Sequence, residues 1–337
     1  MISMAVTLKD IAEMAGVHKS TVDKVIHNRP GVSDAKRQEI RRLLQEYNYE
    51  SNPLAKALNY QKKKGLIAVV LPVVDALPAL KAGMELVRQD FSSFNFEIEY
   101  HEVPFPDGAA QAQCLHKLCQ QGVSGIVLNP IEDPAVVGAL EALKTANIPV
   151  VTVNSDLAPR FCFVGQDMEQ AGRTAARMAG LLLNGCGTLG ILSSHAMRAV
   201  IHRKESFEKC LAAKWPGIQI AEAVDIQETP EAAYQGTAAL LERCPSLNAL
   251  YITCGCVPDI CQALRDQGIH LPVICYERYP AIVELVNSGE VACTISGGLR
   301  NQGRLAMRLL FEYIIYDRIP DGPMVYTKNE ILFQENI

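Results

Sequence analysis

The apolar residues of the first fifty positions recur at the three- and four-residue spacing of amphipathic helices. A first helix is predicted to begin behind Thr7, which forms a capping-box pattern with Asp10. A second helix is predicted over residues 19–26, and Ser33 with Asp34 caps a third. The predicted inward positions are Leu8, Ile11, Ala12 and Ala15 in the first helix, Val22, Val25 and Ile26 in the second, and Ile40, Leu43, Leu44 and Tyr47 in the third.

The first two helices are joined by Ala15-Gly16-Val17, where glycine permits the left-handed turn that ends a helix. Two short helices joined in this way form a helix-turn-helix, whose second helix enters the major groove of DNA. Its lysines can donate to guanine edges or phosphates, and its serine can donate or accept. The alternative is a three-helix bundle whose polar face only meets water. The candidate DNA-binding residues are His18, Lys19, Ser20, Lys24, His27 and Asn28.

Residues 51–64 predict a hinge. Asn52 caps a short helix that has Pro53 at its favoured first position, and Ala55 and Leu58 follow on that helix. A helix of this length is unstable alone in water, so we expect it to form against a partner. The exposed Leu58 suits a wedge between base pairs in the minor groove, with Asn52 and Ala55 beside it on the DNA. The lysines that follow contact the DNA backbone or form a solvated linker.

From residue 65 onward, apolar runs alternate with helical patterns. This alternation predicts doubly wound α/β layers with buried parallel strands, and a body of this size favours two such units. The predicted helices include residues 79–88, 110–121 and 170–183. The predicted strands are residues 66–71, 125–129, 150–153, 188–192, 249–252 and 273–275.

Polar residues follow these strands, at the edge where ligands bind in such sheets. Carboxylate, amide and guanidinium groups that converge there suit a polyhydroxylated ligand. Each one alone is equally consistent with an ordinary turn at a strand end. The candidates from the residues are Asp75, Asn154, Ser155, Arg203, Cys256, Glu277 and Gly297.

Composition and charge narrow the class of protein to which the chain can belong. The chain has 337 residues, enough for about two domains, and its net charge of −5 is uneven. Residues 1–64 hold twelve Lys/Arg against seven Asp/Glu, a net charge of +5, which leaves −10 for the remainder. Such a basic head on an acidic body is expected when only the head meets a polyanion, although chance clustering is the alternative. Eleven cysteines without an export signal favour free thiols in a reducing cytoplasm, and no apolar run is long enough to span a membrane.

The sequence gives only weak indications of metal binding, catalysis or cofactor binding. Cys254-x-Cys256 lacks a second pair at zinc-ribbon spacing, so no metal is expected. His195 and His202 near Ser193 and Ser194 suggest a hydrolase, but no G-x-S-x-G elbow is present. Neither a P-loop nor a dinucleotide fingerprint occurs, and no cofactor is expected. A cytosolic enzyme with a basic interaction module remains the alternative function.

The head resembles that of LacI/GalR family repressors. The resemblance is carried by Val6-Thr7-Leu8-Lys9-Asp10-Ile11-Ala12, Ala15-Gly16-Val17, Ser20-Thr21-Val22, Val32-Ser33 and Tyr49-x-x-Asn52. It implies that His18, Lys19, Ser20 and Lys24 read the major groove and that Leu58 is the hinge wedge. His18 stands where the family usually has serine, so we expect the second helix to lose a good N-cap. Asp23-Lys24 replaces the usual Ser-Arg, which changes the base edge preferred.

The body resembles type I periplasmic sugar-binding proteins of the ribose kind. Ile148-Pro149-Val150 leading to Asn154, and Asn287-Ser288-Gly289 through Ala292-Cys293-Thr294-Ile295, carry this resemblance. It implies that Asn154, Ser155, Arg203 and Glu277 bind sugar hydroxyls. Asn154 replaces the usual aspartate, and Gly297 replaces the usual glutamine. Ala76 and Leu77 stand in the effector site where aromatic rings usually stack on the sugar.

Together these features predict a cytoplasmic, homodimeric, DNA-binding transcriptional regulator, a repressor of a near-palindromic operator, and not an enzyme. Its effector is a small polar molecule, possibly a sugar. The predicted fold is an α/β, two-lobed type I periplasmic-binding-protein-like body, made of two doubly wound parallel sheets, behind a small all-α helix-turn-helix domain. The predicted boundaries are a head over 1–50, a hinge over 51–64 and a body over 65–337, with an N-lobe of 65–158 and 292–324 and a C-lobe of 159–291 and 325–337.

Overall fold

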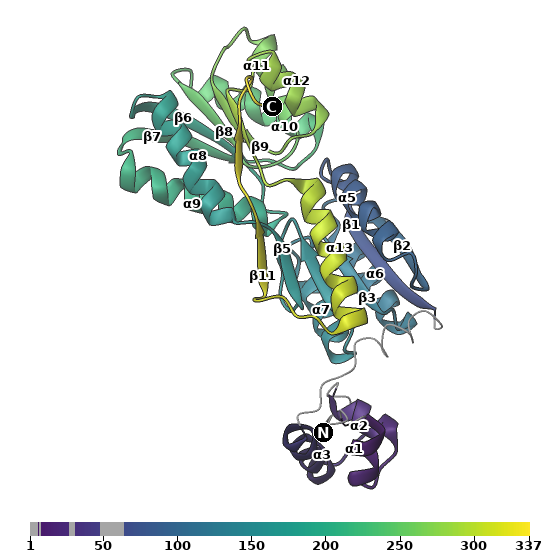
Figure 1. Ribbon diagram of the computed structural model, residues 1–337. Coiled ribbons are helices and arrows are strands. Elements are labelled where there is room, and N and C mark those ends of the chain that lie inside the picture. The colour runs from purple at the N-terminus through teal and green to yellow at the C-terminus, as the bar shows by residue number, and fades with distance from the viewer. Residues whose placement is uncertain (1–5, 7, 27–30, 48–63) are drawn as a thin grey trace.

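A computed structural model describes residue 6 and residues 8–26, 31–47 and 64–337, and of Asp23 it describes the backbone alone. The head contains three helices in its described residues, as predicted, and Figure 1 shows them packed together. Their shared core is formed by buried residues that include Ile11, Val22 and Ile40. The second helix has the predicted bounds. The helices are α1 (Leu8–Met14), α2 (Lys19–Ile26) and α3 (Asp34–Glu46).

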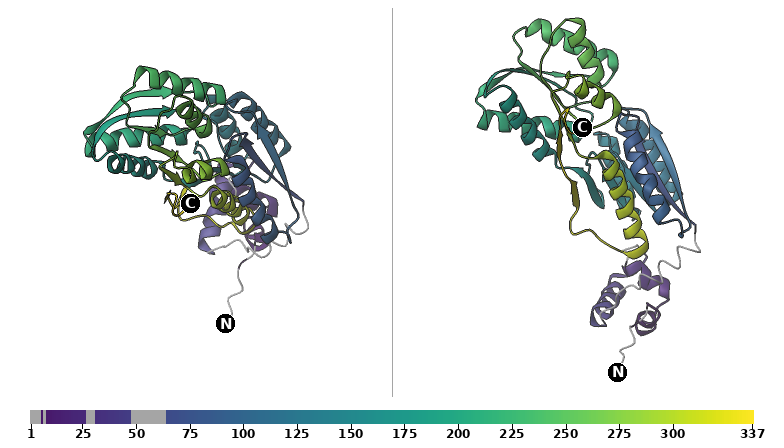
Figure 2. Two further views of the ribbon diagram at one scale, coloured as in Figure 1. Left: turned by 90° about the horizontal axis from the view of Figure 1, so that it is seen from above. Right: turned by 45° about the horizontal axis from the view of Figure 1, so that its top comes forward.

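The body has two lobes, each built on a six-stranded sheet with helices on both faces (Figures 1 and 2). The N-lobe sheet has the strand order β11-β5-β4-β3-β1-β2, and its paired strands are parallel. Its elements are β1 (Gly65–Pro72), α5 (Leu77–Asp90), β2 (Phe96–Val103), α6 (Gly108–Gln121), β3 (Gly125–Leu128), α7 (Pro134–Thr145), β4 (Val150–Val153), β5 (Cys162–Gln166), α13 (Leu299–Tyr316) and β11 (Met324–Thr327).

The C-lobe sheet has the order β12-β10-β9-β8-β6-β7, in which only β12 pairs antiparallel among the described strands. Its elements are α8 (Met168–Leu182), β6 (Cys186–Ser193), α9 (Arg198–Lys214), β7 (Gly217–Asp225), α10 (Pro230–Arg243), β8 (Ala249–Ile252), α11 (Val257–Asp266), β9 (Val273–Tyr276), α12 (Pro280–Asn287), β10 (Cys293–Ser296) and β12 (Glu330–Leu332). The predicted fold class of the body is therefore confirmed.

Alternate side chains of the central strands enter opposite cores, as the pleat of a strand requires. In β1, Ile67 and Val69 pack with α5 and α13, whereas Ala68 and Val70 pack with α6 and α7. A strand buried on both faces shows a continuous apolar run instead of an alternating pattern. For this reason the central strands were recognisable in the sequence.

The predicted lobe boundaries are wrong at three places. The first crossover lies after β5, so residues 159–166 belong to the N-lobe and not to the C-lobe. The second follows β10, which is a C-lobe strand although residues from 292 onward were assigned to the N-lobe. The third follows β11, whose residues 325–327 lie in the N-lobe sheet. The predicted boundaries were placed before these short strands, because the alternation of strand and helix does not reveal a strand such as β5 that follows β4 without a helix.

Glycines allow close packing between helices in both lobes. A Cβ at Gly83 of α5 would lie 1.9 Å from the carbonyl oxygen of Arg300, and one at Gly303 of α13 would lie 2.2 Å from that of Leu80. In the C-lobe, a Cβ at Gly172 of α8 would lie 2.4 Å from the carbonyl oxygen of Arg203 on α9. None of the described helices combines the length and the apolar character needed to cross a membrane.

Candidate functional site

The recognition helix α2 presents a polar face on a tightly built head. Gly16 has a φ of 62°, and the Val17 amide donates to the Ala12 carbonyl, which ends α1 as predicted. Val22 and Val25 are buried in the head core. Lys36 on α3 donates to the Ala15 carbonyl at 2.8 Å, so this lysine joins α3 to the end of α1.

Four of the side chains predicted to contact DNA are exposed. One directly precedes α2 and three lie on it: His18, Lys19, Ser20 and Lys24. The other predicted DNA-binding residues, His27, Asn28, Asn52, Ala55 and Leu58, lie outside the described part of the chain, as does the capping residue Thr7. The expected loss of the N-cap is wrong. The amide of Ser20 donates to Nδ1 of His18 at 3.3 Å, because an imidazole nitrogen can accept this bond as a serine oxygen does.

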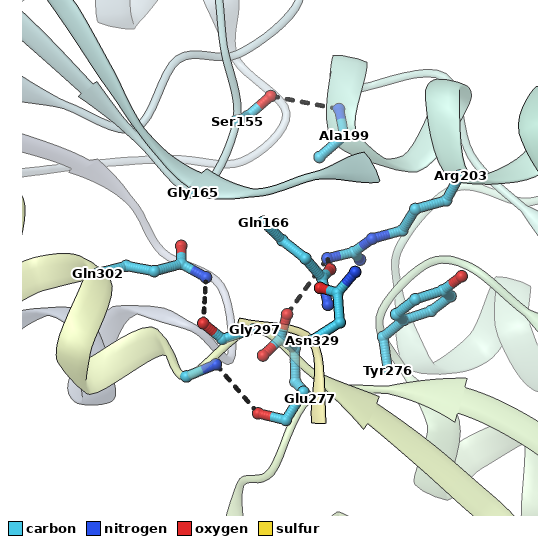
Figure 3. Close-up of polar contacts among 12 residues, drawn as sticks. Ser155, Gly165, Gln166, Ala199, Arg203, Tyr276, Glu277, Gly297, Gln302 and Asn329 are labelled. Atoms are coloured by element: carbon cyan, nitrogen blue, oxygen red, sulfur yellow. Dashed lines mark hydrogen bonds and ion pairs between the residues drawn. The ribbon is translucent and has the colours of Figure 1, made fainter. Parts of the chain in front are cut away.

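A second group of polar side chains lies between the lobes, and we call Gln166, Arg203, Tyr276 and Glu277 the inter-lobe site (Figure 3). Arg203 is only 5% exposed on α9 of the C-lobe. Its Nη2 donates to Oε1 of Gln166 at 2.8 Å, at the end of the N-lobe strand β5, and lies 3.2 Å from Oε1 of Glu277. The guanidinium also stacks over the ring of Tyr276, 4.1 Å from its centre. One arginine thus joins the two lobes.

Glu277 follows β9 and has a φ of 73°, in the left-handed region that a non-glycine residue rarely occupies. Thr294 holds this backbone by donating to the Glu277 carbonyl at 2.7 Å. Burial raises the pKa of the Glu277 carboxyl, whereas the Arg203 charge and the Gly297 amide act to lower it. Desolvation outweighs both, so the site favours the protonated carboxyl of Glu277 more than water does.

Three buried atoms of the inter-lobe site have no hydrogen-bond partner among the described residues. They are Nε of Arg203, Nε2 of Gln166 and Oε2 of Glu277. Buried polar groups are usually paired, so such atoms are available to a ligand. The first two are donors and the third is an acceptor, which matches a ligand whose hydroxyls both donate and accept.

Direct contacts join the lobes beside this site. Ser155, after β4, accepts from the Ala199 amide on α9 at 3.4 Å (Figure 3). The Glu132 amide donates to the Ala196 carbonyl at 2.9 Å, and the Glu132 carboxylate pairs with Arg198. Asn154 is 8% exposed with a φ of 66°. Because Asn154 directly precedes Ser155, it lies next to the first turn of α9.

Asp75 of the N-lobe lies near Cys256 and Tyr279 of the C-lobe. Asp75 is exposed and accepts a hydrogen bond from the Tyr279 hydroxyl. Burial is the main cause that raises the pKa of Tyr279 above its usual range, and Asp75 adds to this effect. Cys256 precedes α11, and burial, with Asp259 and Glu228 nearby, raises the pKa of its thiol to about 12. A neutral thiol is a weak metal ligand. Among the described residues, no group of three His, Cys, Asp or Glu could hold a metal ion.

The other three predicted effector residues, Ala76, Leu77 and Gly297, pack against neighbouring side chains. Ala76 and Leu77 begin α5 and pack, partly buried, against the N-lobe core. Gly297 is buried, and a Cβ there would lie 2.8 Å from Nε2 of Gln302 and 3.0 Å from Cβ of Gln166. The space for a side chain at position 297 is therefore filled by the side chains of Gln302 and Gln166. The Ser194 hydroxyl, one of the groups that suggested a hydrolase, donates to the Glu228 carboxylate.

The sequence reasoning missed four residues: Gln166, Glu132, Gln302 and Asn129. Asn129 is 1% exposed, and neither end of its amide has a partner among the described residues. It directly follows β3 as Asn154 follows β4, so the strand-end rule could have identified it. Gln166 could not be found in this way, because β5 was not predicted.

Comparisons with known proteins agree with this architecture. The family model described as bacterial regulatory proteins, lacI family, matches residues 7–52, and that of a periplasmic binding protein domain matches residues 81–316. The chain is 24% identical over 292 residues to the HTH-type transcriptional regulator MalR of Streptococcus pneumoniae. This alignment covers 81% of this chain and 84% of that protein. It is 21% identical over 348 residues to the catabolite control protein A of Priestia megaterium, with 99% of each covered.

Solved structures share the fold of the body. A putative LacI transcriptional regulator from Bacteroides fragilis has a TM-score of 0.75 at 19% identity and covers 81% of this chain and 98% of that one. GanP, a glucose-galactose binding protein from Geobacillus stearothermophilus, has a TM-score of 0.74 at 18% identity and covers 82% of this chain and 99% of that one.

Proposed function

The chain belongs to the lacI family of bacterial regulatory proteins, with a periplasmic binding protein domain as its body, and on this premise we propose that it is a sequence-specific transcriptional repressor controlled by a small polar, sugar-like effector. The observation that carries the proposal is the joint presence of an exposed, basic recognition helix and a buried arginine that joins two lobes. Its relatives are named as transcriptional regulators and not as enzymes. A regulator of transcription acts in the cytoplasm, where we place this chain.

The head supports DNA binding through α2. Lys19 and Lys24 are exposed cations on a helix that a tight turn at Gly16 joins to α1. Such a helix can enter the major groove, with its lysines on guanine edges or phosphates. Asn52, Ala55 and Leu58 are proposed to form the hinge contacts in the minor groove. Two heads of a homodimer would read the halves of a near-palindromic operator, because two-fold symmetry presents two recognition helices.

The inter-lobe site supports the effector class. Its free donors on Arg203 and Gln166 and its free acceptor on Glu277 suit neighbouring hydroxyls, each of which can donate and accept. Asn154 and Ser155 lie beside it and add polar partners. The effector would change operator affinity only if it binds two arrangements of the lobes unequally. We propose that it does so because Arg203 contacts groups from both lobes.

Binding to a random DNA library tests the proposal. The full chain should enrich a near-palindromic site, whereas residues 65–337 should enrich none, because they lack the head. A thermal-shift screen of sugars and polyols should find a ligand that stabilises both proteins and changes the affinity of the full chain for the enriched DNA. Arg203→Ala should bind the DNA but lose the response to that ligand. A full chain that enriches no sequence, or a fragment that enriches the same one, would contradict the proposal.

A further inference from the structure

The side chain of His18 makes two hydrogen bonds to one residue in the first turn of α2. Its Nδ1 lies 3.3 Å from the backbone amide nitrogen of Ser20 and 2.9 Å from the Ser20 hydroxyl oxygen. Both side chains are exposed on the face that is proposed to meet DNA. The pair is therefore part of the DNA-facing surface and is not a core contact.

The amide bond determines which imidazole nitrogen carries the hydrogen. A backbone amide can only donate, so Nδ1 of His18 must accept from Ser20 and cannot itself be protonated. In a neutral imidazole the hydrogen then resides on Nε2. The Ser20 hydroxyl oxygen lies 2.9 Å from the same unprotonated Nδ1, so the hydroxyl donates its hydrogen to His18, and the two donors share the single lone pair of Nδ1.

We infer that His18 sets the hydrogen-bonding polarity of the first turn of the recognition helix, so that Ser20 offers DNA only an acceptor while Nε2 of His18 offers a donor. A free serine hydroxyl rotates and can donate or accept. Here its single hydrogen is held by the imidazole, and only the oxygen lone pairs remain for another partner. This inference rests on the proposed DNA-binding function and deepens it.

The consequence is a choice of base. In the major groove, adenine N6 and cytosine N4 are amino donors, whereas guanine and the thymine O4 present acceptors. An acceptor-only Ser20 therefore selects adenine or cytosine at the base that it faces. The Nε2–H donor of His18 suits a guanine acceptor or a phosphate oxygen. The histidine thus acts as a specificity-determining residue, partly through its neighbour.

The experiment is DNA selection with the full chain and two variants. Ser20→Ala removes the acceptor and should reduce the adenine or cytosine preference at one half-site position by about fivefold. His18→Ser keeps an oxygen that can cap the Ser20 amide, so the helix should persist, but it frees the Ser20 hydroxyl to rotate. It should admit guanine or thymine at that same position and leave the other positions unchanged.

Nitrogen-15 NMR of the imidazole gives a readout that does not depend on DNA. The inference predicts hydrogen on Nε2 of His18 at neutral pH, and a hydrogen on Nδ1 would overturn it. It is also overturned if His18→Ser leaves the selected sequence unchanged while Ser20→Ala alters it, or if Ser20→Ala alters no position. Failure of the wild-type chain to select any sequence would instead contradict the proposed function.

Discussion

The guanidinium of Arg198, the first residue of α9, donates to both carboxylate oxygens of Glu132 in the opposite lobe, at 2.9 and 3.1 Å. Glu132 follows β3 of the N-lobe, and its amide also donates to the Ala196 carbonyl. The same helix carries Arg203, whose contacts define the inter-lobe site. The first turns of α9 therefore combine a contact that joins the lobes with the group that is proposed to bind the effector.

Glu132→Gln should weaken the contact between the two lobes and lower effector affinity. The pair is partly exposed, so its contribution is small, and a reduction of about two- to fivefold is expected. The measurement is calorimetric titration with the ligand found in the thermal-shift screen. Glu222→Gln is the matched control, because Arg243 and Glu222 make a similar two-bond pair within the C-lobe alone. Equal effects of the two variants, or none from Glu132→Gln, would contradict a role of this pair in effector binding.

The buried carboxyl of Glu277 predicts a pH dependence of stability. Its pKa in the folded state lies above the ordinary 4.5, so its favourable contribution is complete below that pH and is lost as the pH rises through the raised value. Glutamine does not titrate. The free energy of unfolding of Glu277→Gln, minus that of the wild type, should therefore increase as the pH rises from about 4 to about 8 in urea denaturation.

Glu222→Gln should show the opposite trend. Arg243 lowers the pKa of the Glu222 carboxyl, so that carboxylate contributes stability above its ordinary pKa and loses it as the pH falls. Its difference from the wild type should become more negative as the pH rises. If Glu277→Gln followed this same trend, Arg203 rather than desolvation would dominate the pKa of Glu277.

Gly172→Ala should disturb the effector site through the packing of two helices. The added methyl group would lie 2.4 Å from the Arg203 carbonyl oxygen and 2.9 Å from the Phe207 amide nitrogen, so α9 must move. We expect a loss of about 1–3 kcal/mol in the free energy of unfolding and a weaker effector response. Gly138→Ala on α7 is the control, because nothing lies within 4 Å of its added methyl group. It should stabilise the chain by about 0.5–1 kcal/mol, and similar losses in the two variants would show that packing on Arg203 is not the cause.

Leu58→Ala should weaken specific operator binding while the body retains its stability. Leucine at this position is proposed to wedge between base pairs, and alanine is too short to hold such a step open. A reduction of about tenfold or more in affinity for the selected DNA is expected, measured by gel shift. Lys9→Ala serves as a control in the head, because Lys9 is exposed on α1 and pairs with Glu13. Operator affinity that is unchanged by Leu58→Ala would contradict the wedge.

Much of the fold could be predicted because the pattern is local. The helix over residues 19–26 follows from Val22, Val25 and Ile26, and strands such as β1 and β4 follow from runs that are buried on both faces. Polar residues at several strand ends could also be predicted, since ligands in such sheets bind beyond the carboxyl ends of strands. Arg203, Glu277 and Ser155 were identified in this way, and the structure places all three in or beside the inter-lobe site.

By itself, the sequence determined the basic head, the turn at Gly16 and the alternation of strands and helices in the body. Only the tertiary structure decided that Gln166 faces Arg203, that Gln302 fills the space at Gly297, and that β5 and β11 belong to the N-lobe. Periodicity reports which face of an element is buried, but it does not report which distant segment covers that face. The crossings of the chain between the lobes determine which segment covers each face, because they bring residues that are far apart in sequence next to one another.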